Sequence, residues 1–108
     1  MQVKCYIMSH TDDEDNVERQ PKIRMVTIPE GADVEGPDAK LLEAVFYYGQ
    51  NDFAVGPELN TTYSLSVADV VELPNGKLYV VLSCGWENIT SARFEEIRQL
   101  SRRDRCFI

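Results

Sequence analysis

The stretch Ser66–Cys84, SVADVVELPNGKLYVVLSC, contains two β-rich runs separated by a turn. The runs Val67–Leu73 and Leu78–Leu82 are rich in residues that favour strands. Between them, Pro74 presets the backbone angle φ for one turn position, and Gly76 can adopt the left-handed conformation that closes a three-residue loop with a bulge. The pattern predicts a β-hairpin. Because its second strand is apolar on both faces, we expect that strand to lie inside the sheet.

Two further strands are expected nearer the N-terminus. In Val3–Met8, Val3, Cys5 and Ile7 alternate with the other residues, which is typical of a half-buried strand. The run Ile23–Ile28 is rich in β-branched residues and is followed by Pro29. Residues 9–20 between them are polar and acidic, with no apolar period. We therefore predict a hairpin with a long acidic loop.

Two helices are predicted. Asp38 is a plausible N-cap for a helix that runs to Tyr48, with Gly49 at its C-terminal end. Residues 50–63 follow as a loop, anchored on the core by Phe53, Val55 and Leu59. Residues 85–88 are expected to leave the sheet. Thr90 then caps a closing helix, in which Ile89 and Phe94 are placed to form a hydrophobic staple.

These elements predict one α+β domain over residues 1–108, with a small antiparallel or mixed sheet of four to five strands and two helices packed on it. No apolar run approaches the roughly 20 residues that a membrane span needs. The N-terminus is interpreted as a first strand and not as a signal peptide. We therefore expect a cytoplasmic protein that does not insert into membranes.

The three cysteines are too widely spaced for a disulfide framework or a zinc site. Cys5 and Cys84 lie in apolar runs, and both are expected to be buried, reduced thiols. The consecutive carboxylates of residues 12–15 lack the alternation and the glycine of a calcium loop. No nucleotide-binding or metalloprotease motif is found. We therefore predict no cofactor, no metal and no catalytic residue.

The net charge of −7 is distributed unevenly. Residues 9–58 contain twelve acidic and four basic residues, whereas residues 59–108 contain six of each. Nucleic acid is a poor partner for such a chain, because phosphate binding requires clustered lysine and arginine. A basic protein, such as a nucleic-acid-binding protein or a nuclease complex, is a better match. Carboxylates of residues 12–18, extended by Glu30, Asp33 and Glu35, could imitate a phosphate backbone.

Two alternatives depend on other residues. Four arginines near the C-terminus could contact phosphate in a nucleic-acid-associated accessory protein, although cations also suit a helix C-terminus. These are Arg98, Arg102, Arg103 and Arg105. Alternatively, His10 and the neighbouring carboxylates could form a small metal-dependent enzyme. In that case His10→Ala should abolish activity, and a divalent cation should raise the melting temperature.

A resemblance to known proteins covers roughly residues 45–90. It is carried by YGQNDF at Tyr48–Phe53, YSLSVADVVEL at Tyr63–Leu73 and SCGWENI at Ser83–Ile89. These segments resemble small bacterial, phage and plasmid proteins close to the YodL-like domains. Ala68 stands where a glycine is expected, and Trp86 where phenylalanine is frequent. The shared motifs are a strand, a turn and a strand, and no catalytic residue comes with them.

The resemblance implies an origin in a mobile element, whose small acidic proteins often act as anti-defence factors of the anti-CRISPR or anti-restriction type. We therefore predict a non-enzymatic inhibitor that binds a basic partner stoichiometrically through an acidic, DNA-mimicking face. Aromatic side chains are enriched at interfaces and would anchor the contact. The predicted contact residues are Asp12, Asp13, Glu14, Asp15 and Glu18, with Tyr47 or Trp86 as an apolar anchor.

Overall fold

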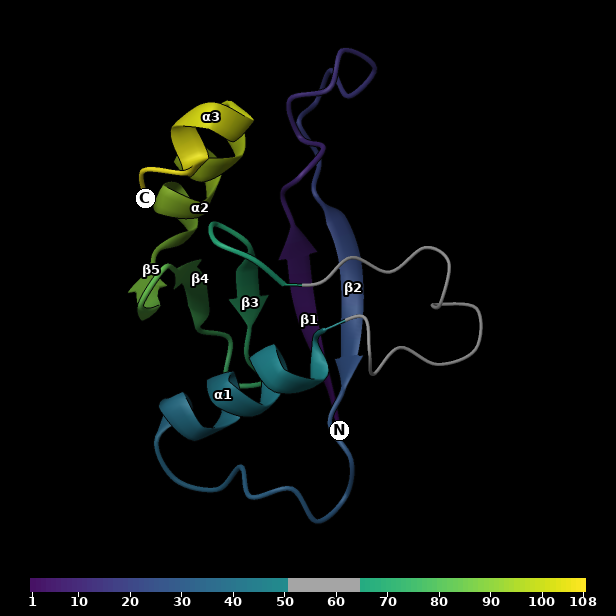
Figure 1. Cartoon of the computed structure of the whole chain (residues 1–108), viewed down its shortest axis with the longest axis vertical. Helices are drawn as coiled ribbons and strands as arrows, with labels where there is room; N and C mark the ends of the chain where they lie inside the picture. Colours follow the sequence, from purple (N-terminus) through teal and green to yellow (C-terminus); the bar gives the residue numbers. More distant parts are fainter. Residues whose placement is uncertain (51–64) are drawn as a thin grey trace.

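The protein is an α+β domain built on one five-stranded antiparallel sheet. The structure is a computed structural model that describes residues 1–50 and 65–108, so the anchors expected at Phe53, Val55 and Leu59 lie outside the described residues. The strands are β1 (Gln2–Ile7), β2 (Lys22–Thr27), β3 (Val70–Glu72), β4 (Leu78–Leu82) and β5 (Gly85–Ile89), in the order β2-β1-β3-β4-β5. The helices are α1 (Asp38–Tyr48), α2 (Ser91–Gln99) and α3 (Arg102–Arg105) (Figure 1). The predicted fold class is confirmed.

The sheet buries apolar side chains on both faces. Leu42 and Val45 of α1 join one hydrophobic cluster with side chains of β1 to β4, including Cys5 and Val81. Ile97 of α2 joins a second cluster on the opposite face. Because successive side chains of a strand point to opposite faces, the adjacent residues Val80 and Val81 of β4 belong to different clusters. This explains why β4 is apolar throughout, and its predicted interior position is confirmed.

The predicted turn between β3 and β4 is present. The backbone N–H of Leu73 donates to Lys77 O at 3.0 Å, and Gly76 N–H donates to Leu73 O at 2.9 Å. Gly76 has φ 86°, the left-handed conformation that this three-residue loop requires. The side chain of Asn75 accepts a bond from Lys77 N–H at 3.0 Å and closes the turn further.

The strand before this turn is shorter than predicted, because a bulge interrupts it. Ala68 N–H donates to Val81 O at 2.8 Å, and Val81 N–H donates to Asp69 O at 2.9 Å. Two residues thus oppose one, and Ala68 has φ 76°. The two bulge residues are also the last two residues of a turn, in which Asp69 N–H donates to Ser66 O at 3.1 Å. A positive φ at the third position of a turn favours glycine, which is the residue expected at position 68.

The prediction that residues 85–88 leave the sheet was wrong. Gly85–Ile89 is β5, which pairs with β4 in antiparallel register from Leu82↔Gly85 to Leu78↔Ile89. The reversal occurs at Ser83 and Cys84, and Gly85 has φ 102°. Cys84 is consequently exposed at a turn, contrary to the buried thiol predicted, whereas Cys5 is buried as expected.

The helix ends agree with the sequence only in part. Thr90 caps α2, and its side chain accepts a hydrogen bond from Arg93 N–H at 3.1 Å. Asp38 is not the N-cap of α1: it is the first helical residue, after Pro37. Gly49 follows α1 with φ −79°, so its role is steric. A Cβ at this position would lie 2.6 Å from Leu65 Cδ1 and 2.6 Å from Val45 O.

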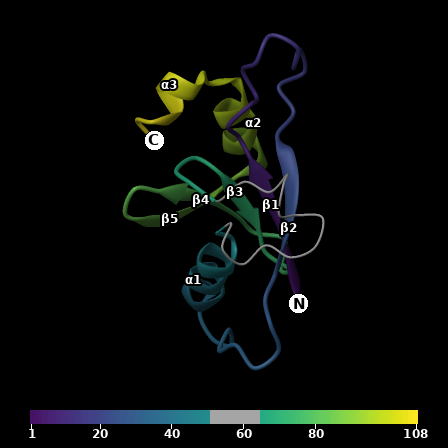
Figure 2. The ribbon, with the colours of Figure 1, turned by 45° about the vertical axis from the view of Figure 1, so that its right-hand side comes forward.

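The C-terminal helices lie beside the loop that joins β1 to β2, at one end of the molecule (Figures 1 and 2). The segment from β2 to α1, which contains Glu30, Asp33 and Glu35, lies at the opposite end (Figure 1). The two acidic segments therefore do not form the single extended surface that the sequence suggested. None of the helices in the described part of the chain has the length and apolar character needed to span a bilayer.

Candidate functional site

The acidic loop, defined here as residues 8–21, is folded by its own hydrogen bonds. Thr11 N–H and the Thr11 hydroxyl both donate to Met8 O, at 3.1 and 3.0 Å. The Asn16 side chain donates to His10 O at 3.1 Å and to Gln20 O at 2.8 Å, and accepts from Gln20 N–H at 3.0 Å. These bonds join the two ends of the loop across its width. Four of these five bonds use the side chain of Thr11 or Asn16, and no apolar period or turn pattern in the sequence indicated them.

Arg105 of α3 fastens the base of the loop to the C-terminal segment. Its guanidinium donates to the Thr11 hydroxyl at 2.7 Å, to Leu100 O at 2.6 Å and to Met8 O at 2.8 Å. It also lies 3.6 Å from Asp12 Oδ1. Arg105 is only 4% exposed. Separating these segments would leave the Arg105 charge unpaired in the interior, so the contacts hold the loop and the C-terminal segment together. We call this set of Arg105 contacts the joint.

Arg98 and Arg102 fasten the rest of the loop. Arg98 of α2 donates to Arg19 O at 3.1 Å and to Glu18 O at 3.0 Å. The backbone N–H of Arg102 donates to Asp12 Oδ2 at 2.8 Å, and its guanidinium donates to Asp13 Oδ1 at 3.1 Å. The acidic run and the C-terminal arginines, which the sequence offered as rival binding surfaces, are therefore joined in one structure. The sequence did not connect them, because 79 to 90 residues separate the partners of these bonds along the chain.

The five predicted carboxylates fall into two groups. Asp12 and Asp13 face the C-terminal arginines, whereas the side chains of Glu14, Asp15 and Glu18 are exposed. The hydrogen bond from Arg102 N–H is the main cause that holds the pKa of Asp12 below its ordinary value, and the Arg105 and Arg102 guanidinium groups act in the same direction. Among the described residues, only Asp12 and Asp13 of the five carboxylates form ion pairs.

A second buried charge, Asp69, lies close to this joint. Its carboxylate accepts Met8 N–H at 2.9 Å and Ser66 N–H at 3.0 Å. It thereby connects the end of β1 to the turn that precedes the bulge. Asp69 is 2% exposed, and burial raises its pKa to about 6, although the hydrogen bonds and Arg105 act in the opposite direction. Met8, Asp69 and Arg105 all line a cavity of about 350 Å³ beside α3.

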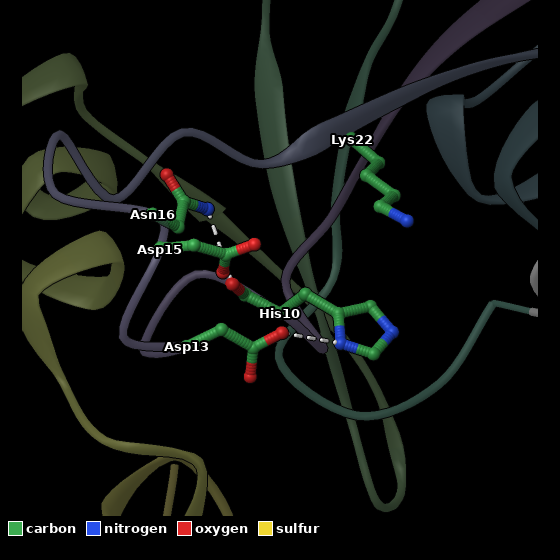
Figure 3. A pocket seen from close by; sticks show the side chains of 5 residues that line it. All are labelled: His10, Asp13, Asp15, Asn16 and Lys22. Carbon is green, nitrogen blue, oxygen red and sulfur yellow. Dashed lines mark hydrogen bonds and ion pairs between the residues drawn. The ribbon is translucent and has the colours of Figure 1, made fainter.

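His10 lies on the other side of the loop, in a shallow hollow of about 460 Å³ (Figure 3). Its Nδ1 is 2.9 Å from Asp13 Oδ2, and Asp15, Asn16 and Lys22 complete the lining. Across residues 1–50 and 65–108, no group of three or more histidine, cysteine, aspartate or glutamate side chains is arranged to hold a metal ion. The contact with His10 gives Asp13 a second partner besides Arg102.

The two predicted aromatic anchors lie in other elements. Tyr47 is 58% exposed near the end of α1, and its ring packs edge-on against Tyr48 at 4.9 Å between centroids. Trp86 of β5 is half-buried against the first cluster. It lines a groove of about 510 Å³ with the start of α1 and Tyr79. The groove includes no residue of the acidic loop.

Three buried charges were missed by the sequence analysis: Arg24, Asp69 and Arg105. A period-two interpretation of β2 could have found Arg24, because it alternates with the buried Val26 and Ile28. Its guanidinium donates to Gly49 O after α1. Asp69 interrupts an apolar run and carries a similar signal. Arg105 carries none, since three other arginines lie within seven residues of it.

The acidic loop and the C-terminal segment together form the candidate site. It contains an ordered loop with three exposed carboxylates and three arginines that bond to the loop, of which Arg98 and Arg105 are largely buried and Arg102 is mostly exposed. Comparison with protein-family models, curated proteins and solved structures gives no match to this chain, so its function is inferred from this geometry and from the sequence.

Proposed function

We propose that this protein is a non-enzymatic inhibitor encoded by a mobile element, which acts in the cytoplasm by binding a basic host protein stoichiometrically. The partner is a nucleic-acid-binding protein or nuclease complex of a defence system. The contact surface is the outer side of the acidic loop, with Glu14, Asp15 and Glu18 as the charged contacts. The mobile-element origin is supported by the resemblance to YodL-like domains alone.

The observation that carries the proposal is the fastening of the acidic loop by arginines from α2 and α3. A flexible loop loses conformational entropy when it binds, and this loss weakens the complex. Here the hydrogen bonds of Arg98, Arg102 and Arg105 already hold the loop in the free protein. The exposed carboxylates can therefore meet a basic surface without a further ordering cost.

The charge of the whole chain favours the same type of partner. A net charge of −7 on 108 residues repels nucleic acid and accelerates encounters with basic proteins at low ionic strength. The contacts of the arginines with the acidic loop also weaken the alternative in which the C-terminal segment binds phosphate. Arg98, Arg102 and Arg105 make the contacts described above, and Arg103 alone of the four has no ion pair among the described residues.

A matched pair of charge variants tests the proposal. In the loop variant, Glu14→Gln, Asp15→Asn and Glu18→Gln remove three negative charges from the proposed surface. In the control variant, Glu30→Gln, Asp33→Asn and Glu35→Gln remove three from the opposite end of the molecule (Figure 1). Tagged forms of all three proteins are used to capture partners from bacterial lysate at low and then moderate salt, and mass spectrometry identifies what is bound.

We expect the unaltered protein and the control variant to capture one nuclease or nucleic-acid-binding protein in stoichiometric amount, with loss as the salt concentration rises. The loop variant should capture much less at every salt concentration. Equal capture by the two variants would exclude the acidic loop as the contact surface. If the unaltered protein captured no specific partner at either salt concentration, the inhibitor proposal itself would be rejected.

A further inference from the structure

Two arginines of α3 contact the acidic loop in different ways. Arg105 is 4% exposed and bonds to main-chain and hydroxyl oxygens as well as lying near Asp12. The side chain of Arg102 is 59% exposed, and its described partners are the carboxylates alone, with Asp13 Oδ1 at 3.1 Å and Asp12 Oδ1 at 4.0 Å. Arg105 thus joins the elements, whereas the Arg102 side chain lies across the surface of the joint.

The two carboxylates do not depend on the Arg102 side chain for their positions. Asp12 Oδ2 accepts the backbone N–H of Arg102, a bond that any residue with a backbone N–H can donate at that position. Asp12 Oδ1 lies 3.6 Å from the Arg105 guanidinium. Asp13 Oδ2 is held by His10 Nδ1 at 2.9 Å. Removal of the Arg102 side chain should therefore leave both carboxylates in place and expose them.

Exposed ion pairs of this type contribute little to stability, because water and salt screen them and long side chains lose freedom in forming them. An arginine or lysine from another protein could replace the Arg102 guanidinium at little cost. The same surface has a hollow of about 610 Å³, which is lined by Asp12 and Asp13 together with Ser101, Arg102, Arg103 and Cys106, so that Arg102 itself borders the space beside the two carboxylates.

We propose that Arg102 is an autoinhibitory contact: its side chain occupies Asp12 and Asp13 in the free protein, and an arginine-rich surface of the partner displaces it. This inference rests on the proposed function and adds a regulation to it. It assigns Asp12 and Asp13 to the bound state, in addition to the three carboxylates that are exposed in the free protein. Because the partner must displace Arg102, it binds more weakly than it would bind an acidic loop without this contact. The same requirement favours partners that carry a guanidinium group at the matching position.

The test uses a fluorescent nona-arginine peptide as the probe, with binding followed by anisotropy at about 0.1 M salt, where charges more than about 10 Å apart are largely screened. Arg102→Ala should strengthen binding by roughly two- to fivefold, the factor that corresponds to loss of a competing surface ion pair. Arg102→Lys, which keeps the charge, should bind the peptide about as the unaltered protein does. Adding Asp13→Asn to Arg102→Ala should remove the gain.

Arg93→Ala is the matched control, because it removes the same charge from an exposed pair with Glu96 on α2. An equal gain from Arg93→Ala and Arg102→Ala would attribute the effect to net charge and overturn the inference. Thermal melts of each variant confirm that the fold is retained. The peptide assay is independent of the lysate capture: a gain confined to Arg102→Ala supports the autoinhibitory contact even if no host partner is found, in which case only the proposed function fails.

Discussion

Two residues in the turn and bulge at Ser66–Asp69 have features that cost free energy of folding. Ala68 adopts a φ of 76°, which residues with a side chain rarely adopt. Asp69 places a carboxylate in the interior. Both are compensated by hydrogen bonds that connect the turn to β1 and β4. These two residues therefore determine how the end of β1, on which the acidic loop is built, meets the rest of the sheet.

We predict that Ala68→Val destabilises the protein by about 2 kcal/mol or more, because a β-branched side chain is strained at this positive φ and the site is buried. Ala68→Gly should remain within about 1 kcal/mol of the unaltered protein, since relief of strain and loss of the buried methyl group oppose each other. Urea unfolding measures both values. If Ala68→Val left the stability unchanged, that result would contradict the positive φ.

We also predict that Asp69 makes stability depend on pH. Its pKa in the folded protein is about 6, above the ordinary 3.8, so the folded state holds the proton more tightly. The stabilisation is full below about pH 4 and is lost as the pH rises through about 6. The difference between these two pKa values corresponds to roughly 3 kcal/mol of folding free energy. Asp12, whose pKa is lowered, contributes in the opposite direction and loses its stabilisation as the pH falls.

Urea titrations between pH 4 and pH 7 test this prediction by comparison with Asp69→Asn. The amide does not titrate, so the contribution from Asp69 should disappear from the slope of stability against pH. An amide has one acceptor oxygen, so the variant should also lose one of the two hydrogen bonds that Asp69 now accepts from backbone N–H groups. Parallel curves for the two proteins would show that Asp69 does not titrate in this range.

Among the elements, α3 is held to the acidic loop more strongly by one arginine than by another. Arg105 is buried and bonds to three oxygen atoms of residues outside α3. The side chain of Arg102 is mostly exposed and contacts carboxylates at the surface. With only four residues, α3 could not be stable as an isolated helix, so its position depends on these contacts.

We therefore expect Arg105→Ala to destabilise the protein by about 3–5 kcal/mol, because it removes a buried guanidinium and leaves the Asp12 carboxylate without its nearest charged partner. Arg102→Ala should cost less than about 1 kcal/mol, since its side-chain contacts are exposed. Urea unfolding of the two variants provides the comparison, and both remove one positive charge from α3. Similar losses in the two variants would contradict the assignment of Arg105 as the joint.

In the molecule as a whole, one sheet separates two hydrophobic clusters. The first lies between the sheet and α1, and the second between the sheet and α2. Because the same strands contribute to both clusters, neither cluster can be lost while the other stays intact. Trp86, the single tryptophan, packs on the first cluster, whereas Ile97 is fully buried in the second. The fluorescence of Trp86 therefore reports on the first cluster, while a substitution of Ile97 perturbs the second cluster on the opposite face of the sheet.

Ile97→Ala should destabilise the protein by about 2–5 kcal/mol, as expected when a buried isoleucine leaves a cavity. We expect the unfolding midpoint followed by Trp86 fluorescence to fall together with the midpoint followed by far-ultraviolet circular dichroism, because a domain of this size usually unfolds in one transition. If the fluorescence midpoint were unchanged while the circular dichroism midpoint fell, the two faces would be independent units.

Local patterns along the chain were sufficient to predict the α+β class, the interior strand β4 with its turn at residues 74–76, the capped start of α2 and the position of α1. Each depends on neighbours in the chain: the apolar period, the conformations open to glycine and proline, and the hydroxyl that caps a helix. Only the tertiary structure showed that residues 85–89 form β5. Their pairing with β4 depends on an exposed turn and on a positive φ at Gly85.

Tertiary packing also sets the roles of the charged residues. The acidic loop and the C-terminal arginines are separated by 79 to 97 residues in the hydrogen bonds that join them, and no local pattern reports such a contact. Burial of Asp69 and Arg105 depends in the same way on which segments cover them. The sequence therefore indicated an acidic surface, whereas the packed chain showed that two of its five predicted carboxylates are held by the protein's own arginines.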